Sequence, residues 1–106
     1  MNQQDFNELS SLVTPEVAID FPGAGRVEGK RRTLLLLKSI LRKYDDLTFS
    51  VLEILTEGER ACAVWTNEGH SATGEAYRNS GITLLHFKDE KISFISDYFK
   101  DTSFVP

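Results

Sequence analysis

The residue best placed to do chemistry in this sequence is an aspartate within a run of strand-forming residues. Asp97 alternates with Ile95 and Phe99, so all three side chains should share one face of a strand. A carboxyl on a covered apolar face is costly unless it is hydrogen-bonded or protonated, and such a group can act as a general acid or base. The alternative is an exposed aspartate near a strand end, or one that accepts a backbone N–H.

A second strand carries an aromatic and a polar residue that can face the same pocket. Alternation over residues 60–68 places Trp65 and Asn67 on one face and Cys62 on the other. The alternative for Trp65 is a core position in a curved sheet. A buried indole N–H then needs a partner, for which Asn67 and Asp97 are the candidates.

No self-sufficient catalytic or metal-binding motif stands elsewhere in the chain. The glycines of residues 23–25 lack the strand–loop–helix context of a phosphate loop, and there is no nucleophile elbow. His70, His86 and Cys62 lack the spacing of metal ligands, so we expect no metal and no other cofactor. We expect His70 in a loop and His86 on the outer sheet surface.

Two helices are expected to hold the strands in place. Apolar spacing predicts helices over residues 5–13 and 30–44, with Pro15 ending the first. The alternation changes phase after Val51, which predicts a β-bulge and a bend. The expected strands are two short ones at 17–21 and 26–28 and four long antiparallel ones at 47–56, 60–68, 77–87 and 91–99.

Helices followed by a run of strands predict an α+β layer packing, and the bulge and the long strands predict a curved sheet wrapped on the helices. The length predicts one small domain over residues 1–106. The chain is 41% hydrophobic, which suffices for a single core, and its net charge of −4 argues against a nucleic-acid partner. No apolar run is long enough for a membrane span. Half of the basic residues lie in residues 30–43, where a solvated helix face is favoured over a phosphate site. One cysteine and no signal peptide predict a cytoplasmic protein.

The C-terminal third carries a recognisable pattern. It contains Gly74-x-x-Tyr77-x-Asn79, then Phe87-x-Asp89-x-Lys91-Ile92, then Asp97-Tyr98-Phe99-x-Asp101. This pattern resembles the NTF2-like superfamily, which includes ketosteroid isomerases, SnoaL-like polyketide cyclases and limonene-epoxide-hydrolase-like proteins. The resemblance implies a cone of about four long antiparallel strands, with a pocket between sheet and helices. Compared with the family pattern, we expect the sequence to begin after the longer helix with which family members usually open. The pocket should then be more open or be covered by a partner chain, and a truncated start is the alternative.

The resemblance also implies catalytic positions, which this chain fills only in part. Asp97 matches the catalytic aspartate of the epoxide hydrolases, but their arginine and second aspartate fall on Trp65 and Asn67, which can do neither job. Asp20 lies where the isomerases carry a proton-shuttling aspartate, with a turn residue as the alternative. The strand acid of the isomerases falls on Thr83, which is a weaker donor than a protonated carboxyl.

The combined prediction is a pocket for a small, mostly apolar molecule, with Asp97 and Asp20 as candidate acids or bases. A binding domain without catalysis is slightly favoured over an isomerase, cyclase or epoxide-hydrolase-type enzyme, because neither known set of acids and bases is complete. The other expected ligand-binding residues are Trp65, Asn67, Asn79, Thr83, Ile95 and Phe99.

The sheet face away from the pocket is expected to bury against a second copy of the chain. Burial of apolar area stabilises such a contact, and a two-fold homodimer is the commonest arrangement. Strand alternation places on this outer face the residues Cys62, Val64, Ile82, Leu84, Phe94 and Tyr98.

Overall fold

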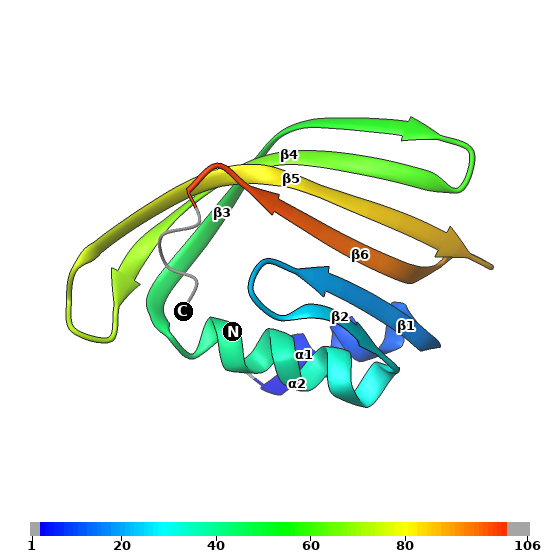
Figure 1. The fold of residues 1–106 in the computed structure, drawn as a ribbon, viewed down its shortest axis with the longest axis horizontal. Helices are drawn as coiled ribbons and strands as arrows, with labels where there is room; N and C mark the ends of the chain where they lie inside the picture. Colours follow the sequence, from blue (N-terminus) through cyan, green and yellow to red (C-terminus); the bar gives the residue numbers. More distant parts are fainter. Residues whose placement is uncertain (1–2, 102–106) are drawn as a thin grey trace.

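The computed structural model, which describes residues 3–101, is a curved six-stranded sheet with both helices beneath its concave side (Figure 1). This confirms the predicted α+β class and the curved sheet on helices. Along the chain the elements are α1 (Gln3–Ser11), β1 (Val13–Phe21), β2 (Gly25–Glu28), α2 (Lys30–Leu41), β3 (Tyr44–Glu57), β4 (Arg60–Ser71), β5 (Ala76–Lys88) and β6 (Lys91–Phe99).

The sheet is larger and less uniform than the sequence suggested. Its strand order is β2-β1-β6-β5-β4-β3, so the two N-terminal strands extend the four long ones into a single sheet of six. The four long strands β3 to β6 are antiparallel as predicted. The first strand, whose partner the sequence left open, runs parallel to β6 with Ile19 opposite Ile95. These strands are separated by most of the chain, and no local pattern specifies a partner at that distance.

The prediction that Pro15 ends the first helix is wrong. The helix ends at Ser11, and Val13 and Thr14 are already buried in β1. Pro15 itself is exposed and lies in the stretch where the register of β1 against β6 shifts, between Val13 and Ala18. A residue without an N–H is tolerated there because the regular ladder is already interrupted.

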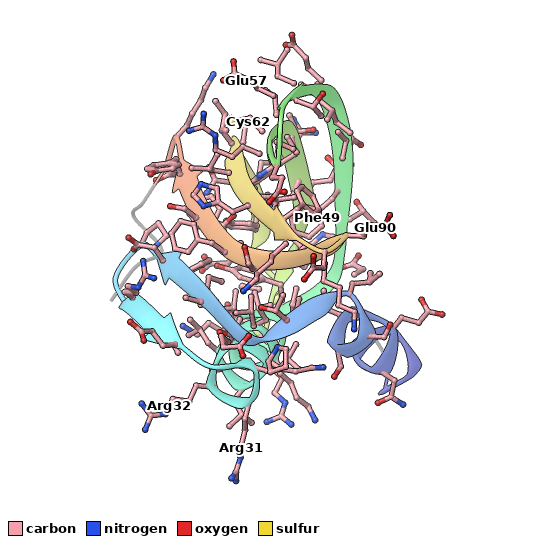
Figure 2. All side chains as sticks on the ribbon, turned by 90° about the vertical axis from the view of Figure 1, so that its right-hand side faces the viewer. Arg31, Arg32, Phe49, Glu57, Cys62 and Glu90 are labelled. Carbon is pink, nitrogen blue, oxygen red and sulfur yellow. The ribbon has the colours of Figure 1, made fainter. Side chains whose placement is uncertain are left out.

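Helix α2 packs on the concave face and supplies one wall of the interior. Thr33 is fully buried and donates a hydrogen bond from Oγ1 to the carbonyl of Val17 at 3.3 Å. Arg31 and Arg32 project from the side of the helix away from the sheet (Figure 2). The helix ends at Leu41, three residues before the predicted end. No helix within residues 3–101 is long and apolar enough to cross a membrane.

The bend predicted in the first long strand is present. The register between β3 and β4 shifts between Val51 and Glu53, which confirms the β-bulge. A second shift lies near the start of β3, between Asp45 and Thr48. The prediction of a loop at His70 is wrong, because β4 continues to Ser71 and pairs there with the beginning of β3. Strands β3 and β4 are therefore longer than the predicted strands at 47–56 and 60–68.

Candidate functional site

An apolar cavity of about 410 Å³ lies between the concave face of the sheet and the two helices. Leu9 of α1 and Leu37, Ile40 and Leu41 of α2 form the helical wall. Strands β1 and β3 to β6 form the opposite wall, which is mainly aliphatic and aromatic. Among the described residues, the polar side chains on that wall are Tyr44, Asn67, Tyr77, Thr83 and Asp97.

A directed chain of hydrogen bonds leads to the one acidic group of this lining. The indole N–H of Trp65 donates to Oγ1 of Thr83 at 2.8 Å, and the Thr83 hydroxyl donates to Oδ1 of Asp97 at 2.6 Å. An indole nitrogen can only donate and an ionised carboxylate can only accept, so with Asp97 ionised the Thr83 hydroxyl accepts from Trp65 and donates to Asp97. While Oδ1 keeps this bond from Thr83, a proton on the carboxyl resides on Oδ2.

The carboxyl of Asp97 is easier to protonate than an ordinary aspartate. Burial raises its pKa above the usual value, and the hydrogen bond from Thr83 offsets part of this by lowering it. The register explains the contact, because Thr83 on β5 lies directly opposite Asp97 on β6. Thr83 thus takes the place that the sequence analysis had given to Asn67 or Asp97 as the partner of the Trp65 N–H.

A row of aromatic rings crosses the sheet beside this hydrogen-bond chain. Phe21 meets Phe99 with ring centroids 5.2 Å apart, Phe99 meets Trp65 at 5.3 Å, and Trp65 meets Phe49 at 5.6 Å, all edge to face. Such contacts are the preferred geometry for aromatic pairs. The row provides rigid, flat apolar surfaces along the cavity.

Gly81 makes that row continuous, and sequence reasoning missed it. It lies on β5 between Trp65 on β4 and Phe99 on β6 in the register. A Cβ at this position would overlap the carbonyl oxygen of Tyr98 and would lie 3.0 Å from Cζ2 of Trp65. The available signal was a glycine in the interior of a predicted strand, which often marks a close approach of neighbouring groups.

Two tyrosines were also missed at one end of the cavity. Tyr44, which the sequence placed in the second helix, opens β3 and stacks against Tyr77 with ring centroids 4.3 Å apart. Burial raises the pKa of Tyr44, and Tyr77 raises it further, so Tyr44 is a neutral phenol at physiological pH. The apolar periodicity of the predicted helix continues through Tyr44, so the sequence alone does not separate this residue from the helix. Its contact with Tyr77 of β5 shows that it belongs to the sheet.

Six of the predicted site residues converge on this cavity, and two do not. Asp20 is exposed, because its neighbours Ile19 and Phe21 turn toward the interior and alternation sends Asp20 to the opposite face. The prediction that Asp20 lies beside the pocket is therefore wrong. The six residues that line the cavity are Trp65, Asn67, Thr83, Ile95, Asp97 and Phe99.

Asn79, the other residue outside the lining, has a structural explanation. Its Nδ2 donates to the Tyr77 hydroxyl at 3.1 Å and to the carbonyl of Asp101 at 2.8 Å. Its Oδ1 accepts from the backbone N–H of Ser80 at 2.9 Å and of Asp101 at 3.1 Å. These four bonds use the capacity of the amide and hold the chain beyond β6 against β5.

The described side chains were also compared with the requirements of a metal-binding site. Among them, no group of three or more histidines, cysteines, aspartates and glutamates lies close enough to hold a metal ion. What the geometry provides is one protonatable carboxyl, a fixed relay of two donors and an aromatic wall. This arrangement can bind an apolar molecule, orient its polar group and exchange a proton with it.

Solved structures of similar shape share this cone. A SnoaL-like protein from Jannaschia sp. CCS1 has a TM-score of 0.86 at 14% identity, covering 93% of this chain and 74% of the other. A protein with a ketosteroid isomerase-like fold from Catenulispora acidiphila has 0.81 at 17% identity, covering 94% and 78%. TerC, co-crystallised with polyporic acid, has 0.83 at 18% identity, covering 95% and 83%. No curated protein matches the sequence significantly.

The curved sheet, the helices under its concave face and the apolar cavity between them together define an NTF2-like fold, as these structural similarities show. A sequence model of the SnoaL-like domain matches residues 1–95. The chain belongs to the SnoaL-like domain family.

Proposed function

We propose that this chain binds a small, mostly apolar molecule in the cavity, with Asp97 as the polar anchor. The observation that carries the proposal is a single carboxyl of raised pKa in a wall of aliphatic and aromatic side chains, within the described residues. Apolar contact supplies most of the affinity in such sites, and a few polar groups fix the orientation. A protonated Asp97 donates from Oδ2, which suits a carbonyl or ether oxygen. The small-molecule complex of TerC supports a ligand of this general kind.

Binding is expected to be visible at Trp65, because it is the only tryptophan and its N–H belongs to the Asp97 relay. Titration with 2-acetonaphthone, a neutral aromatic ketone, should shift the indole N–H resonance saturably. If each heavy atom of the ketone contributes about 0.3 kcal/mol of binding free energy, its dissociation constant should be roughly millimolar or tighter. The anionic 2-naphthalenesulfonate, of similar size, should leave the resonance in place. Equal, non-saturating responses to both compounds would contradict the proposal.

A second candidate function is proton transfer by Asp97, favoured by its raised pKa in a cavity. An epoxide-hydrolase triad is not supported, because Trp65 and Asn67 carry no charge and Trp65 is occupied as a donor to Thr83. An isomerase that uses Asp20 is not supported either, because Asp20 lies on the opposite face. The catalytic candidate is therefore Asp97 acting as the acid or base without the partners of either known set.

We also propose that the outer face of the sheet mediates a homodimer. The register places Val64, Ile82 and Tyr98 side by side on strands β4, β5 and β6. Ile82 is 42% exposed and Tyr98 is 60% exposed in the single chain. Burying this apolar area against the same face of a second copy stabilises a dimer by about 25 cal/mol per Å².

Replacing Ile82 with glutamate should convert the dimer to a monomer, because each copy would then bury an unpaired carboxylate in the apolar contact. Analytical ultracentrifugation at micromolar concentration measures the change. Leu35→Glu is the matched control, since Leu35 is 57% exposed but lies on α2. It should leave the dimer intact. A wild-type chain that sediments as a monomer would refute the assembly.

A further inference from the structure

We propose that Asn67 is a second polar contact for the ligand and that it selects molecules carrying a hydrogen-bond donor, such as a hydroxyl or N–H. This deepens the proposed function and rests on it, because Asn67 and Asp97 line the same cavity. The ligand class is then an elongated apolar molecule with an acceptor at its Asp97 end and a donor at its Asn67 end.

The amide of Asn67 is buried without a protein partner for its oxygen. The residue is only 8% exposed, and Oδ1 has no hydrogen-bond partner within the part of the chain that the structure describes. A buried acceptor left unpaired costs about 1–3 kcal/mol, and native structures carry few of them. A donor on the ligand that reaches Oδ1 removes this cost, so the affinity gain is specific to molecules that bear one.

The neighbouring Asn79 shows what a structural asparagine looks like in this sheet. It lies directly opposite Asn67 in the register of β4 and β5 and is equally buried. Its amide makes four hydrogen bonds, two of them to the backbone of Asp101. Paired residues share a sheet face, so the two asparagines differ in their partners and not in their orientation. Only Asn67 lines the cavity, and its oxygen is left for another partner.

The distance between the two polar points sets the length of the ligand. Asn67 lies four residues along β4 from Ala63, which pairs with Thr83, and Thr83 pairs with Asp97. At about 3.3 Å per residue this is roughly 13 Å along the strands, and two strand spacings of about 4.8 Å add roughly 10 Å across them. The two backbone positions are therefore roughly 16 Å apart, and the side chains shorten the gap. The indole of Trp65 lies between these points, so a flat two-ring molecule can rest against it and reach both.

Two matched ketones test the inference. The probes are 6-hydroxy-2-acetonaphthone, with a donor opposite its carbonyl, and 6-methoxy-2-acetonaphthone, which lacks the donor. Titrated against the Trp65 N–H resonance, the hydroxy compound should bind the wild type about tenfold more tightly. Asn67→Leu should bind both compounds alike, close to the wild-type affinity for the methoxy compound. Thr66→Val, on the outer sheet face, should keep the tenfold preference.

The outcomes separate this inference from the proposed function. If both ketones bind the wild type equally, the role of Asn67 is overturned while binding in the cavity stands. If neither ketone binds, both proposals are overturned. Thermal melting gives an independent check, because Asn67→Leu should melt at the same temperature as the wild type or higher. A fall of several degrees would show that the amide supports the fold and would overturn the inference without any ligand.

Discussion

Replacing Gly81 with alanine is expected to destabilise this protein by about 3 kcal/mol, which is the upper range for overpacking a closed core. The added methyl group would overlap the Tyr98 carbonyl oxygen and crowd Cζ2 of Trp65. Backbone on one side and a buried ring on the other leave it no room. The substitution should also displace the indole from Thr83, so the Trp65 N–H resonance should move in the free protein. Denaturant unfolding measures the change in stability.

Gly58→Ala is the matched control for Gly81→Ala. Gly58 has a positive φ of 58°, and a Cβ there would meet nothing within 4 Å. Its cost is backbone strain alone, about 1–2 kcal/mol. The Trp65 resonance should stay in place because the turn lies outside the cavity lining. Equal stability of the two variants, together with the same shift of the Trp65 N–H resonance, would contradict the prediction that close packing around Gly81 positions the indole.

Asp97→Asn is expected to stabilise the protein at pH 8 and to leave its stability nearly unchanged at pH 3.5. Because burial raises the pKa of Asp97 above 3.8, the folded state holds its proton at pH values where the unfolded state has lost it. Folding stability from this group is complete below the unfolded pKa and is lost as the pH rises through the folded pKa. Asparagine cannot lose a proton, so the advantage of the variant grows with pH.

The size of that advantage reports the pKa shift directly, at about 1.4 kcal/mol per unit. Thermal melts of the wild type and the variant across this pH range give the value. Asp20→Asn is the control, since Asp20 is exposed on the other face and should show no such growth. A variant that loses stability equally at every pH would identify Asp97 as an ordinary structural residue.

The same variant decides between the two candidate functions. If Asp97 catalyses proton transfer, the wild type should accelerate deuterium exchange at the acidic C1 position of 2-tetralone. Asp97→Asn should then lower that rate about 100-fold or more, the usual share of a general acid or base. If Asp97 only anchors a ligand, neither protein should accelerate exchange, and the variant should bind 2-acetonaphthone more weakly. Asp20→Asn should match the wild type in both assays.

Strand alternation predicted much of the site because its period is local. Ile95, Asp97 and Phe99 share a face through their own backbone geometry, and so do Trp65 and Asn67. The same rule predicted that Val64 and Ile82 share the outer face, and the register pairs them across β4 and β5. The prediction for Asp20 came from the resemblance to isomerases and not from the alternation of its own strand. That alternation turns Asp20 outward.

Contacts between strands needed the register, which the sequence does not specify. Thr83 mediates between Trp65 and Asp97 only because β5 lies between β4 and β6 with that alignment. Gly81 matters for the same reason, since its lack of a side chain counts only where two neighbours approach it. One residue of slippage would turn Thr83 away from the cavity.

By itself, the sequence determined the class of fold, the curved sheet and the face of the residues within the four long predicted strands, because those features follow from local patterns of a few residues. The tertiary structure alone decided the parallel pairing of β1 with β6, the entry of Tyr44 into the cavity and the relay through Thr83. Each of these depends on atoms brought together from distant parts of the chain. Their energies come from packing and desolvation in the assembled interior, which no local segment experiences before the chain has folded.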